Sequence, residues 1–374
     1  MQAAPAPVFR KTVETFSPEA KTLPQRYYVS AEVFAEEQAT IFSSQWACVG
    51  HQTQIPRAGD FFLATVAAES LIIVRDQQSG VRAFYNVCRH RGTRMCEETA
   101  GHSATIQCPY HAWTYALDGR LVGAPQMDTA PGFRKAEHSL IAANVGVWEG
   151  FIFVNLGEEP TPLDSWFAAL RGKFAQFNLP NLRTGKRVEY EVRANWKLIF
   201  ENYSECYHCP GVHPMLSKVS PYDSAENDLT EGPFLGGFMS ISKGASLTLS
   251  ANACARPVGE MNVEDHARVF YYSIFPNMLL SMHPDYIMVH QIWPEAPDRT
   301  RIVCDWFFHP DAFTRADFHP EDAVEFWDVT NKQDWHVCEL SQQGITSRAY
   351  QTGPYSPRES IPAAWDREYL RYVR

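Results

Sequence analysis

The sequence has no run of about 18 or more apolar residues, so it offers no candidate for a membrane-spanning helix. It also lacks a basic excess: 33 Lys and Arg against 43 Asp and Glu give a formal net charge of −10. That balance argues against nucleic acid as a partner. The N-terminus lacks the basic and then apolar regions of a secretory signal, so we expect a cytoplasmic protein.

The chain also has no Gly-x-Gly-x-x-Gly fingerprint after a strand-like segment, so no nucleotide site is indicated. It is not poor in cysteine, because nine are present. The number is odd and the chain is large, so structural disulfides are not expected and metal ligation is the use to test. With 45% hydrophobic and 20% charged residues, the chain is expected to fold around a sizeable core.

The pattern of residues divides the chain into three parts. Residues 1–45 are a lead-in with a helix over 31–44. Residues 46–156 contain short β-type runs broken by Gly, Pro, Asp and Asn, which predict a small all-β domain. Residues 157–374 mix strands and helices, which predicts an α+β domain. Its expected helices are 163–177, 195–208 and 321–347, and its expected strands are 188–193, 269–274, 286–293 and 301–308.

Two short segments each combine a cysteine with a histidine: Cys88-Arg89-His90, and Cys108-Pro109-Tyr110-His111. Seventeen residues separate His90 from Cys108. Two thiolates and two imidazoles are the ligand set of a Rieske-type [2Fe–2S] cluster. The alternative is a Cys₂His₂ zinc site, but one residue between paired ligands is tight for a single tetrahedral metal. The spacing therefore favours the iron–sulfur cluster.

These motifs, extended to Arg91-Gly92 and to Ala112-Trp113, resemble the Rieske domain of ring-hydroxylating and related oxygenases. The resemblance implies an all-β Rieske domain followed by a helix-grip-like α+β catalytic domain built around an antiparallel sheet. Trp113 either covers the cluster or is an ordinary core aromatic. Cys96, near the first loop, is expected to be a buried thiol rather than a ligand.

A second set of donors begins at His208, with His213 five residues further on. We expect His208 at the end of a helix that Pro210 and Gly211 break. Two imidazoles and one carboxylate on one face of iron(II) leave positions open for O₂. The resemblance implies that the carboxylate comes from the C-terminal helix, where Asp334 fits; Asp328 and Glu339 are the alternatives.

The resemblance also gives Glu205 a role. In this family a carboxylate three residues before the first iron-binding histidine bridges the cluster of one subunit and the iron of its neighbour in a head-to-tail homotrimer. Such a bond to a ligating imidazole fixes the ring orientation and tunes the metal. Most ring dioxygenases have Asp at this position. Glu205 with the following Cys-Tyr-His-Cys is similar to the branch acting on carnitine, choline and glycine betaine.

The segments Trp327–Asp334, Gln342–Ile345 and Tyr350–Ser356 resemble glycine betaine monooxygenases, which implies hydroxylation of an N-methyl group, loss of formaldehyde and a demethylated amine. A quaternary ammonium ion has no N–H and is held by aromatic faces. Candidates on expected strands are Tyr271, Tyr272, Phe275, Trp293 and Phe307. Electrons from NADH or NADPH are expected to arrive through a separate flavin and iron–sulfur reductase.

Two alternatives remain open from the sequence. The enzyme could act on an aromatic or other small carboxylic acid instead of a betaine. The chain could also be a Rieske electron carrier without chemistry of its own, but a carrier needs only about 110–120 residues. The second donor set, His208, His213 and Asp334, argues against a carrier, because it implies a third iron per chain.

Overall fold

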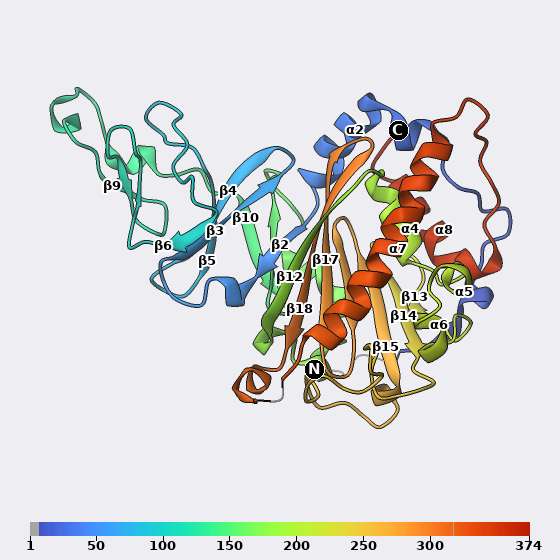
Figure 1. Ribbon diagram of the computed structural model, residues 1–374. Coiled ribbons are helices and arrows are strands. Elements are labelled where there is room, and N and C mark those ends of the chain that lie inside the picture. The colour runs from blue at the N-terminus through green and yellow to red at the C-terminus, as the bar shows by residue number, and fades with distance from the viewer. Residues whose placement is uncertain (1–6, 317) are drawn as a thin grey trace. The chain divides into compact units, whose positions relative to one another are not determined.

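The computed structural model describes residues 7–316 and 318–374, and the chain folds as two compact units (Figure 1). One unit combines the segment up to Thr40 with Leu170–Arg374, and the other is Ile41–Ala169. Among the described helices, none combines the length and the hydropathy that crossing a bilayer requires. We call Ile41–Ala169 the β unit and the other the catalytic unit.

The β unit is built from three small antiparallel sheets, with strand orders β10-β11-β2, β5-β4-β3-β6 and β7-β8-β9. Its core gathers apolar side chains from β4, β5 and the two Cys/His segments, including Ile72, Phe84, Trp113 and Tyr115. The strands are β2 (Ala47–His51), β3 (Asp60–Val66), β4 (Glu69–Arg75), β5 (Val81–Tyr85), β6 (Ala100–His102), β7 (Ile106–Gln107), β8 (Thr114–Tyr115), β9 (Leu121–Gly123), β10 (Asn144–Trp148) and β11 (Phe151–Asn155).

The catalytic unit is built on one eight-stranded antiparallel sheet of order β1-β13-β14-β15-β16-β17-β18-β12. The fold class expected from the sequence, an all-β Rieske domain and an α+β domain, is thereby confirmed. The strands are β1 (Arg10–Lys11), β12 (Arg183–Val192), β13 (Glu226–Leu229), β14 (Phe234–Ser240), β15 (Arg268–Ile274), β16 (Met278–Met282), β17 (Ile287–Ala296) and β18 (Arg299–Phe308).

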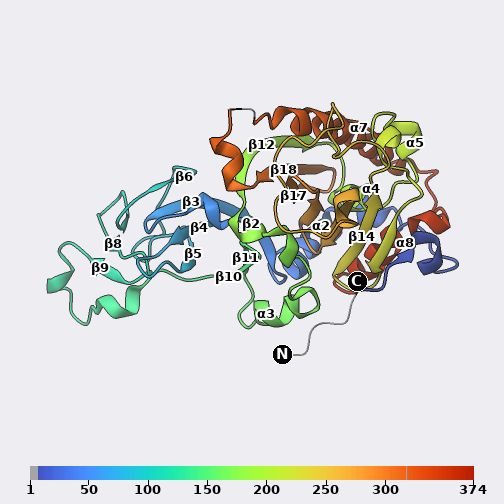
Figure 2. The same ribbon diagram turned by 90° about the horizontal axis from the view of Figure 1, so that it is seen from below.

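The longest helix, α7 (Glu321–Ile345), lies across one face of this sheet (Figure 1). In the view of Figure 2 the sheet curves around the side on which α7 and α4 lie. The shorter helices are α1 (Arg26–Val29), α2 (Ala31–Glu37), α4 (Trp196–Tyr203), α5 (Cys209–Val212), α6 (Leu216–Val219) and α8 (Ser360–Tyr369); α3 (Leu163–Trp166) belongs to the β unit. The candidate site lies between α7 and the sheet.

Three expected helices are shorter than the sequence indicated. The helix expected over 31–44 ends at Glu37 and continues as a π-helical turn, Gln38–Phe42. The one expected over 163–177 is α3 followed by separate 3-10 turns, because Gly172 adopts φ +72° between them. The helix expected over 195–208 ends at Tyr203, for reasons given below.

Helix α4 is fixed by a buried charged network. The Asn195 side chain accepts from the Lys197 N–H at the helix start (3.1 Å). The fully buried Lys197 ammonium lies 2.5 Å from Glu37, which also accepts from Trp196 (2.9 Å) and from the Tyr369 hydroxyl (2.6 Å). A buried charge is tolerated only when it is paired and hydrogen-bonded, as here. The N-terminal turn of α4 is therefore held by α2 and α8, and the opposite end of the helix leads into the candidate site.

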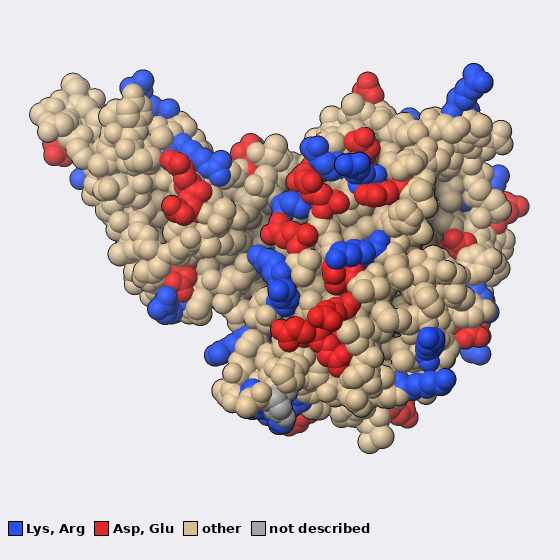
Figure 3. Space-filling model, viewed as in Figure 1, with Lys and Arg blue, Asp and Glu red and all other residues tan. Residues whose placement is uncertain are grey.

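On the face shown in Figure 3, acidic and basic side chains are interspersed. That face therefore carries no broad area of a single sign of charge.

Candidate metal centres

The two Cys/His segments of the β unit have the same backbone design. In the first, the Cys88 carbonyl accepts from the Gly92 N–H (3.0 Å) and the Cys88 N–H donates to the Thr93 carbonyl (2.8 Å). In the second, Cys108 makes the equivalent bonds with the N–H of Ala112 (3.1 Å) and the carbonyl of Trp113 (2.8 Å). Gly92 and Ala112 close the turns with φ of +75° and +58°. Two equivalent loops thus each present one cysteine and one histidine.

The four side chains of these loops lie together. Cys88 and Cys108 are buried within hydrogen-bonding reach of each other, and the rings of His90 and His111 are 4.7 Å apart. The His90 Nδ1 atom is buried and has no hydrogen-bond partner among the described residues, as a nitrogen reserved for a metal would be. Burial, with His111 and Arg91 nearby, lowers the pKa of His90 and favours the neutral ring that can ligate. These residues fit a histidine- and cysteine-ligated cluster.

Two neighbours of this group were considered from the sequence. Trp113 is buried in the core and stacks on His90, with ring centroids 4.8 Å apart and planes 9° apart, so it is both a core residue and a wall of the site. Cys96 is half-buried, less than expected. The Tyr115 hydroxyl, which the sequence analysis did not single out, lies 3.6 Å from Cys88 Sγ, close enough to hydrogen-bond the sulfur.

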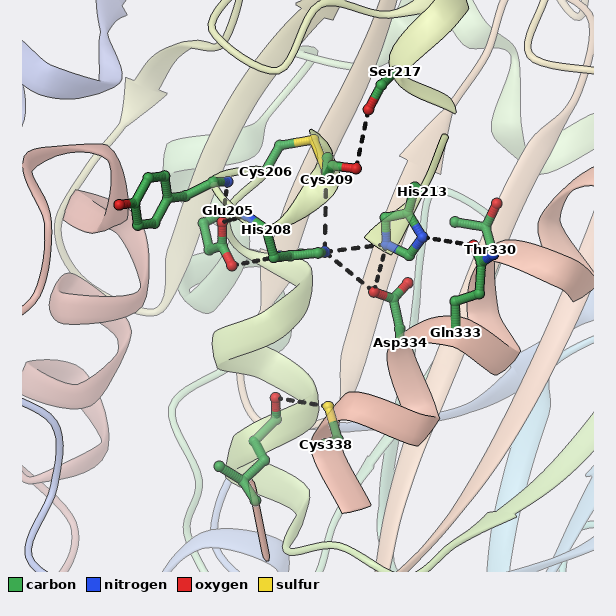
Figure 4. Close-up of polar contacts among 12 residues, drawn as sticks. Glu205, Cys206, His208, Cys209, His213, Ser217, Thr330, Gln333, Asp334 and Cys338 are labelled. Atoms are coloured by element: carbon green, nitrogen blue, oxygen red, sulfur yellow. Dashed lines mark hydrogen bonds and ion pairs between the residues drawn. A yellow bond between two sulfur atoms is a disulfide. The ribbon is translucent and has the colours of Figure 1, made fainter. Parts of the chain in front are cut away.

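In the catalytic unit, helix α4 ends at Tyr203 because the Glu205 carboxylate takes over the backbone donors that follow (Figure 4). Its Oε2 accepts from the N–H groups of Tyr207 and His208, the latter at 3.2 Å. Such a local side-chain bond competes with helix continuation. Pro210 does not break a helix here; it lies in the first turn of α5, where proline is favoured.

The chain between Glu205 and α5 also contains a disulfide, Cys206–Cys209, that encloses His208. The expectation that cysteines would not pair is wrong at this position, because two cysteines three residues apart meet where the chain turns into α5. Cys209 Sγ lies 4.0 Å from His208 Nε2, but pairing leaves it no thiolate to offer a metal. The donors available in this region are therefore nitrogen and oxygen.

His208, His213 and Asp334 converge on one point (Figure 4). Asp334 Oδ1 lies 2.8 Å from His213 Nε2 and 3.2 Å from His208 Nε2, and the two nitrogens are 3.1 Å apart. The outer ring nitrogens are also fixed: Glu205 Oε1 lies 2.5 Å from His208 Nδ1, and Gln333 Oε1 lies 2.9 Å from His213 Nδ1. Bonds of that kind set the ring orientation of metal-binding histidines.

Asp334 reaches this point because it lies on the buried face of α7. Trp327, Asn331 and Cys338 are buried at helical spacings of −7, −3 and +4 from it. The two alternatives lie off that face: Asp328 bonds the Tyr190 hydroxyl (2.9 Å), and Glu339 bonds the Arg193 N–H (2.9 Å).

The carboxylate and imidazole groups of this site stabilise each other's charged forms. Burial alone raises the pKa of Asp334, but hydrogen bonds from His208 and His213 outweigh it and lower that pKa below its ordinary value. Burial alone lowers the pKa of His208, but hydrogen bonds to Asp334 and Glu205 raise it to about 10. A pKa raised in this way favours the protonated ring, so a metal ion that uses His208 as a ligand has to displace a proton. Two imidazoles and one carboxylate are the facial set of non-haem iron(II) oxygenases.

A cavity of about 320 Å³ opens onto these donors, a volume suited to a small ligand. Aromatic side chains from α4, α7 and the sheet contribute to its wall. The ring centroids of Tyr203 and Tyr271 are 6.0 Å apart, and those of Tyr271 and Trp327 are 6.4 Å apart. Phe238 and Trp335 also line it.

Of the five aromatic residues suggested from the sequence, Tyr271 lines this cavity. Tyr272, next to it on β15, points to the opposite face of the sheet because strand side chains alternate, and its hydroxyl bonds Asp228 (3.0 Å). Phe275 stacks on Tyr372 (4.9 Å). Trp293 and Phe307 are buried away from the cavity lining. The suggestion was therefore wrong for four of the five.

The comparisons with known proteins match each part of the chain to a domain family. Residues 45–135 match the Rieske [2Fe–2S] domain family, and residues 179–374 match the ring-hydroxylating α-subunit catalytic domain family. The chain belongs to this family of Rieske non-haem iron oxygenases, and it is an enzyme. The family carries a Rieske [2Fe–2S] cluster and a catalytic mononuclear iron. The class, the enzyme character and the cofactors expected from the sequence are thereby confirmed.

Particular relatives are similar over most of their length. The glycine betaine monooxygenase oxygenase subunit of Chromohalobacter salexigens is 33% identical over 371 residues, which cover 90% of this chain and 82% of the relative. The carnitine monooxygenase oxygenase subunit of Escherichia coli is 28% identical, covering 89% and 86%. The crystal structure of the quaternary ammonium Rieske monooxygenase CntA with L-carnitine superimposes with a TM-score of 0.80 at 27% identity, covering 95% and 96%.

Proposed function

We propose that this protein is the oxygenase component of a two-component monooxygenase that hydroxylates an N-methyl group of a small, glycine betaine-like quaternary ammonium compound. The observation that carries the proposal is the aromatic cavity that opens directly onto His208, His213 and Asp334. Aromatic faces attract a cation that cannot donate a hydrogen bond. Relatives named for glycine betaine, carnitine and choline support the same substrate class.

The proposed reaction balances with O₂ and two electrons. One oxygen atom enters a C–H bond of an N-methyl group, and the other leaves as water with two protons. The hydroxymethylammonium product then loses its hydroxyl proton and breaks its C–N bond, whose electron pair stays on nitrogen, which releases formaldehyde, a proton and the demethylated amine. The two electrons come from NADH or NADPH through a separate flavin and iron–sulfur reductase, and cross between subunits of a homotrimer.

The residues divide this work as follows. Cys88, His90, Cys108 and His111 hold the cluster, which supplies single electrons. His208, His213 and Asp334 hold the iron, which supplies O₂ activation when it is bound. Glu205 fixes the orientation of the His208 ring. It also bridges the electron path between the cluster of a neighbouring subunit and the iron held by His208. The wall formed by Tyr203, Tyr271 and Trp327 excludes water and turns a methyl group toward the donors.

The test is O₂-dependent formaldehyde release by the purified enzyme with a compatible reductase, against a panel of glycine betaine, carnitine, choline and aromatic carboxylic acids. We expect formaldehyde and the dimethylamino product from at least one quaternary ammonium compound, coupled to one NAD(P)H. Oxygenation of an aromatic or other small acid without turnover of any quaternary ammonium compound would establish the alternative function.

A further inference from the structure

The rim of the cavity carries two basic side chains, Lys11 and Arg358, that form no ion pair among the residues the structure describes. Lys11 lies on β1, and Arg358 lies in a 3-10 turn, Pro357–Glu359, directly before α8. The carboxylates of the lining are Glu205, Asp223 and Asp334, and none of them forms an ion pair with Lys11 or Arg358 within the described chain. A positive group facing a ligand cavity without a protein partner is available to an anionic part of the ligand.

Arg358 is better placed than Lys11 because its backbone is fixed. Ser356 Oγ accepts from the Arg358 N–H (3.3 Å), and the Glu359 carboxylate accepts from the Ser356 N–H (2.6 Å), which together form a capping box. The Glu359 carboxylate, the nearest one in sequence, therefore bonds the backbone and forms no ion pair with the guanidinium in the described part of the chain. Lys11 is exposed and carries a flexible ammonium.

The guanidinium is also oriented by an aromatic ring. Arg358 Cζ lies 5.0 Å from the ring centroid of Tyr222, which lines the same cavity. A guanidinium held on a ring keeps its planar edge of N–H donors free, and that edge matches the two oxygens of a carboxylate. Arg358 is only partly exposed, so water screens such a pair less than on an open surface.

We propose that Arg358 determines substrate specificity by binding the carboxylate of a zwitterionic substrate. This inference rests on the proposed function and deepens it, because a carboxylate bound by Arg358 would make the enzyme prefer betaines to quaternary ammonium alcohols. The cationic head is attracted by the rings of Tyr203, Tyr271 and Trp327 and repelled by Arg358. A molecule with opposite charges at its two ends therefore has one favourable orientation, with its N-methyl groups away from Arg358.

The experiment compares Arg358→Ala and Arg358→Lys in the full holoenzyme, with Arg367→Ala as the matched control because Arg367 is exposed on α8 and lies outside the cavity lining. The ligands are glycine betaine and choline, which share the trimethylammonium head and differ in the carboxylate. Isothermal titration calorimetry gives Kd for both, and formaldehyde release gives KM and kcat. Circular dichroism and iron content check that each variant is folded and loaded.

We expect Arg358→Ala to raise Kd and KM for glycine betaine roughly 10- to 100-fold, the usual weight of a hydrogen-bonded charge, with kcat little changed. Arg358→Lys should recover part of this loss. Choline binding and the Arg367→Ala variant should stay within about twofold. Unchanged betaine affinity in Arg358→Ala, or an equal loss for choline, would overturn the inference. If betaine binding depends on Arg358 but no formaldehyde is released, the proposed N-demethylation is refuted. The role of Arg358 in binding a carboxylate would then still stand.

Discussion

Removing the Glu205 carboxylate is the perturbation that separates iron binding from electron supply. Oε1 of Glu205 lies 2.5 Å from His208 Nδ1, and Oε2 holds the backbone N–H groups of Tyr207 and His208. In Glu205→Gln the amide oxygen can still accept from the backbone, while its NH₂ group faces His208 Nδ1. The variant therefore isolates the carboxylate–imidazole bond.

A hydrogen bond to a charged group contributes about 1.5–3 kcal/mol, which corresponds to roughly a 10- to 150-fold effect. The Glu205 side chain is about 10% exposed, so little of this is lost to solvent screening. We expect iron(II) affinity to fall within that range in Glu205→Gln and further in Glu205→Ala, because Ala also frees the two backbone donors. Saturating iron(II) should then restore three irons per chain in both variants.

The assay follows the visible absorbance of the cluster after enzyme reduced with dithionite is mixed with glycine betaine and O₂. With iron restored, we expect cluster reoxidation and formaldehyde formation to remain slow in Glu205→Gln and to be abolished in Glu205→Ala. The control is Glu339→Gln, which alters a carboxylate that bonds the Arg193 N–H away from the site. Wild-type reoxidation and product formation in iron-saturated Glu205→Ala would refute the role of Glu205 in the electron path.

Three further predictions follow from the same geometry. Asp334→Ala should leave two irons per chain and an intact cluster signal by electron paramagnetic resonance, whereas Asp328→Ala should keep three; equal iron in both would contradict the ligand assignment. Cys88→Ser should remove the cluster signal and keep the mononuclear iron. Burial raises the pKa of Glu201 from 4.5 to about 7, so the folded state holds an extra proton between these values and the free energy of unfolding falls as pH rises through them. Glu201→Gln should reduce the loss of stability between pH 5 and pH 8, measured as the difference in Tm between these two pH values. The same Tm difference in the variant and the wild type would contradict the raised pKa of Glu201.

The cluster site was predictable because its residues are local. Each loop places one cysteine and one histidine within four residues, and the glycine after the first pair marks the positive φ that closes the turn. The iron site was only partly predictable. His208 and His213 are close in sequence, but Asp334 lies 121 residues beyond His213, and only the family resemblance joined them.

Helix α7 also carries a local sequence signal for the carboxylate. Trp327, Asn331, Asp334 and Trp335 recur at helical spacing, which places a carboxylate among bulky buried side chains. That pattern favours Asp334 over Asp328 without any knowledge of the family. It also marks both tryptophans as neighbours of the ligand, whereas the strand aromatics were chosen without regard to alternation.

The rest of the cavity depends on pairings that no local pattern encodes. Phe238 and Tyr271 lie near each other because β14 pairs with β15, and Gly237 pairs directly with Tyr271. A Cβ atom at Gly237 would lie 1.9 Å from the Glu226 carbonyl oxygen of β13, so glycine is required for the sheet to close there. In the sequence alone, Gly236-Gly237 indicates a break in a strand rather than the wall of a site.

The position of α7 explains why iron ligation and substrate recognition are joined in one structure. A single face of this helix supplies the carboxylate to the histidines and two tryptophans to the cavity, so a shift of the helix would move both together. The opposite wall is the sheet, and the histidines follow α4 in the segment whose turn the Glu205 carboxylate holds in place. In the proposed function, a substrate bound between these walls would lie against His208, His213 and Asp334. Substitutions at Trp327 should consequently change which methyl group is oxidised more than whether iron is bound.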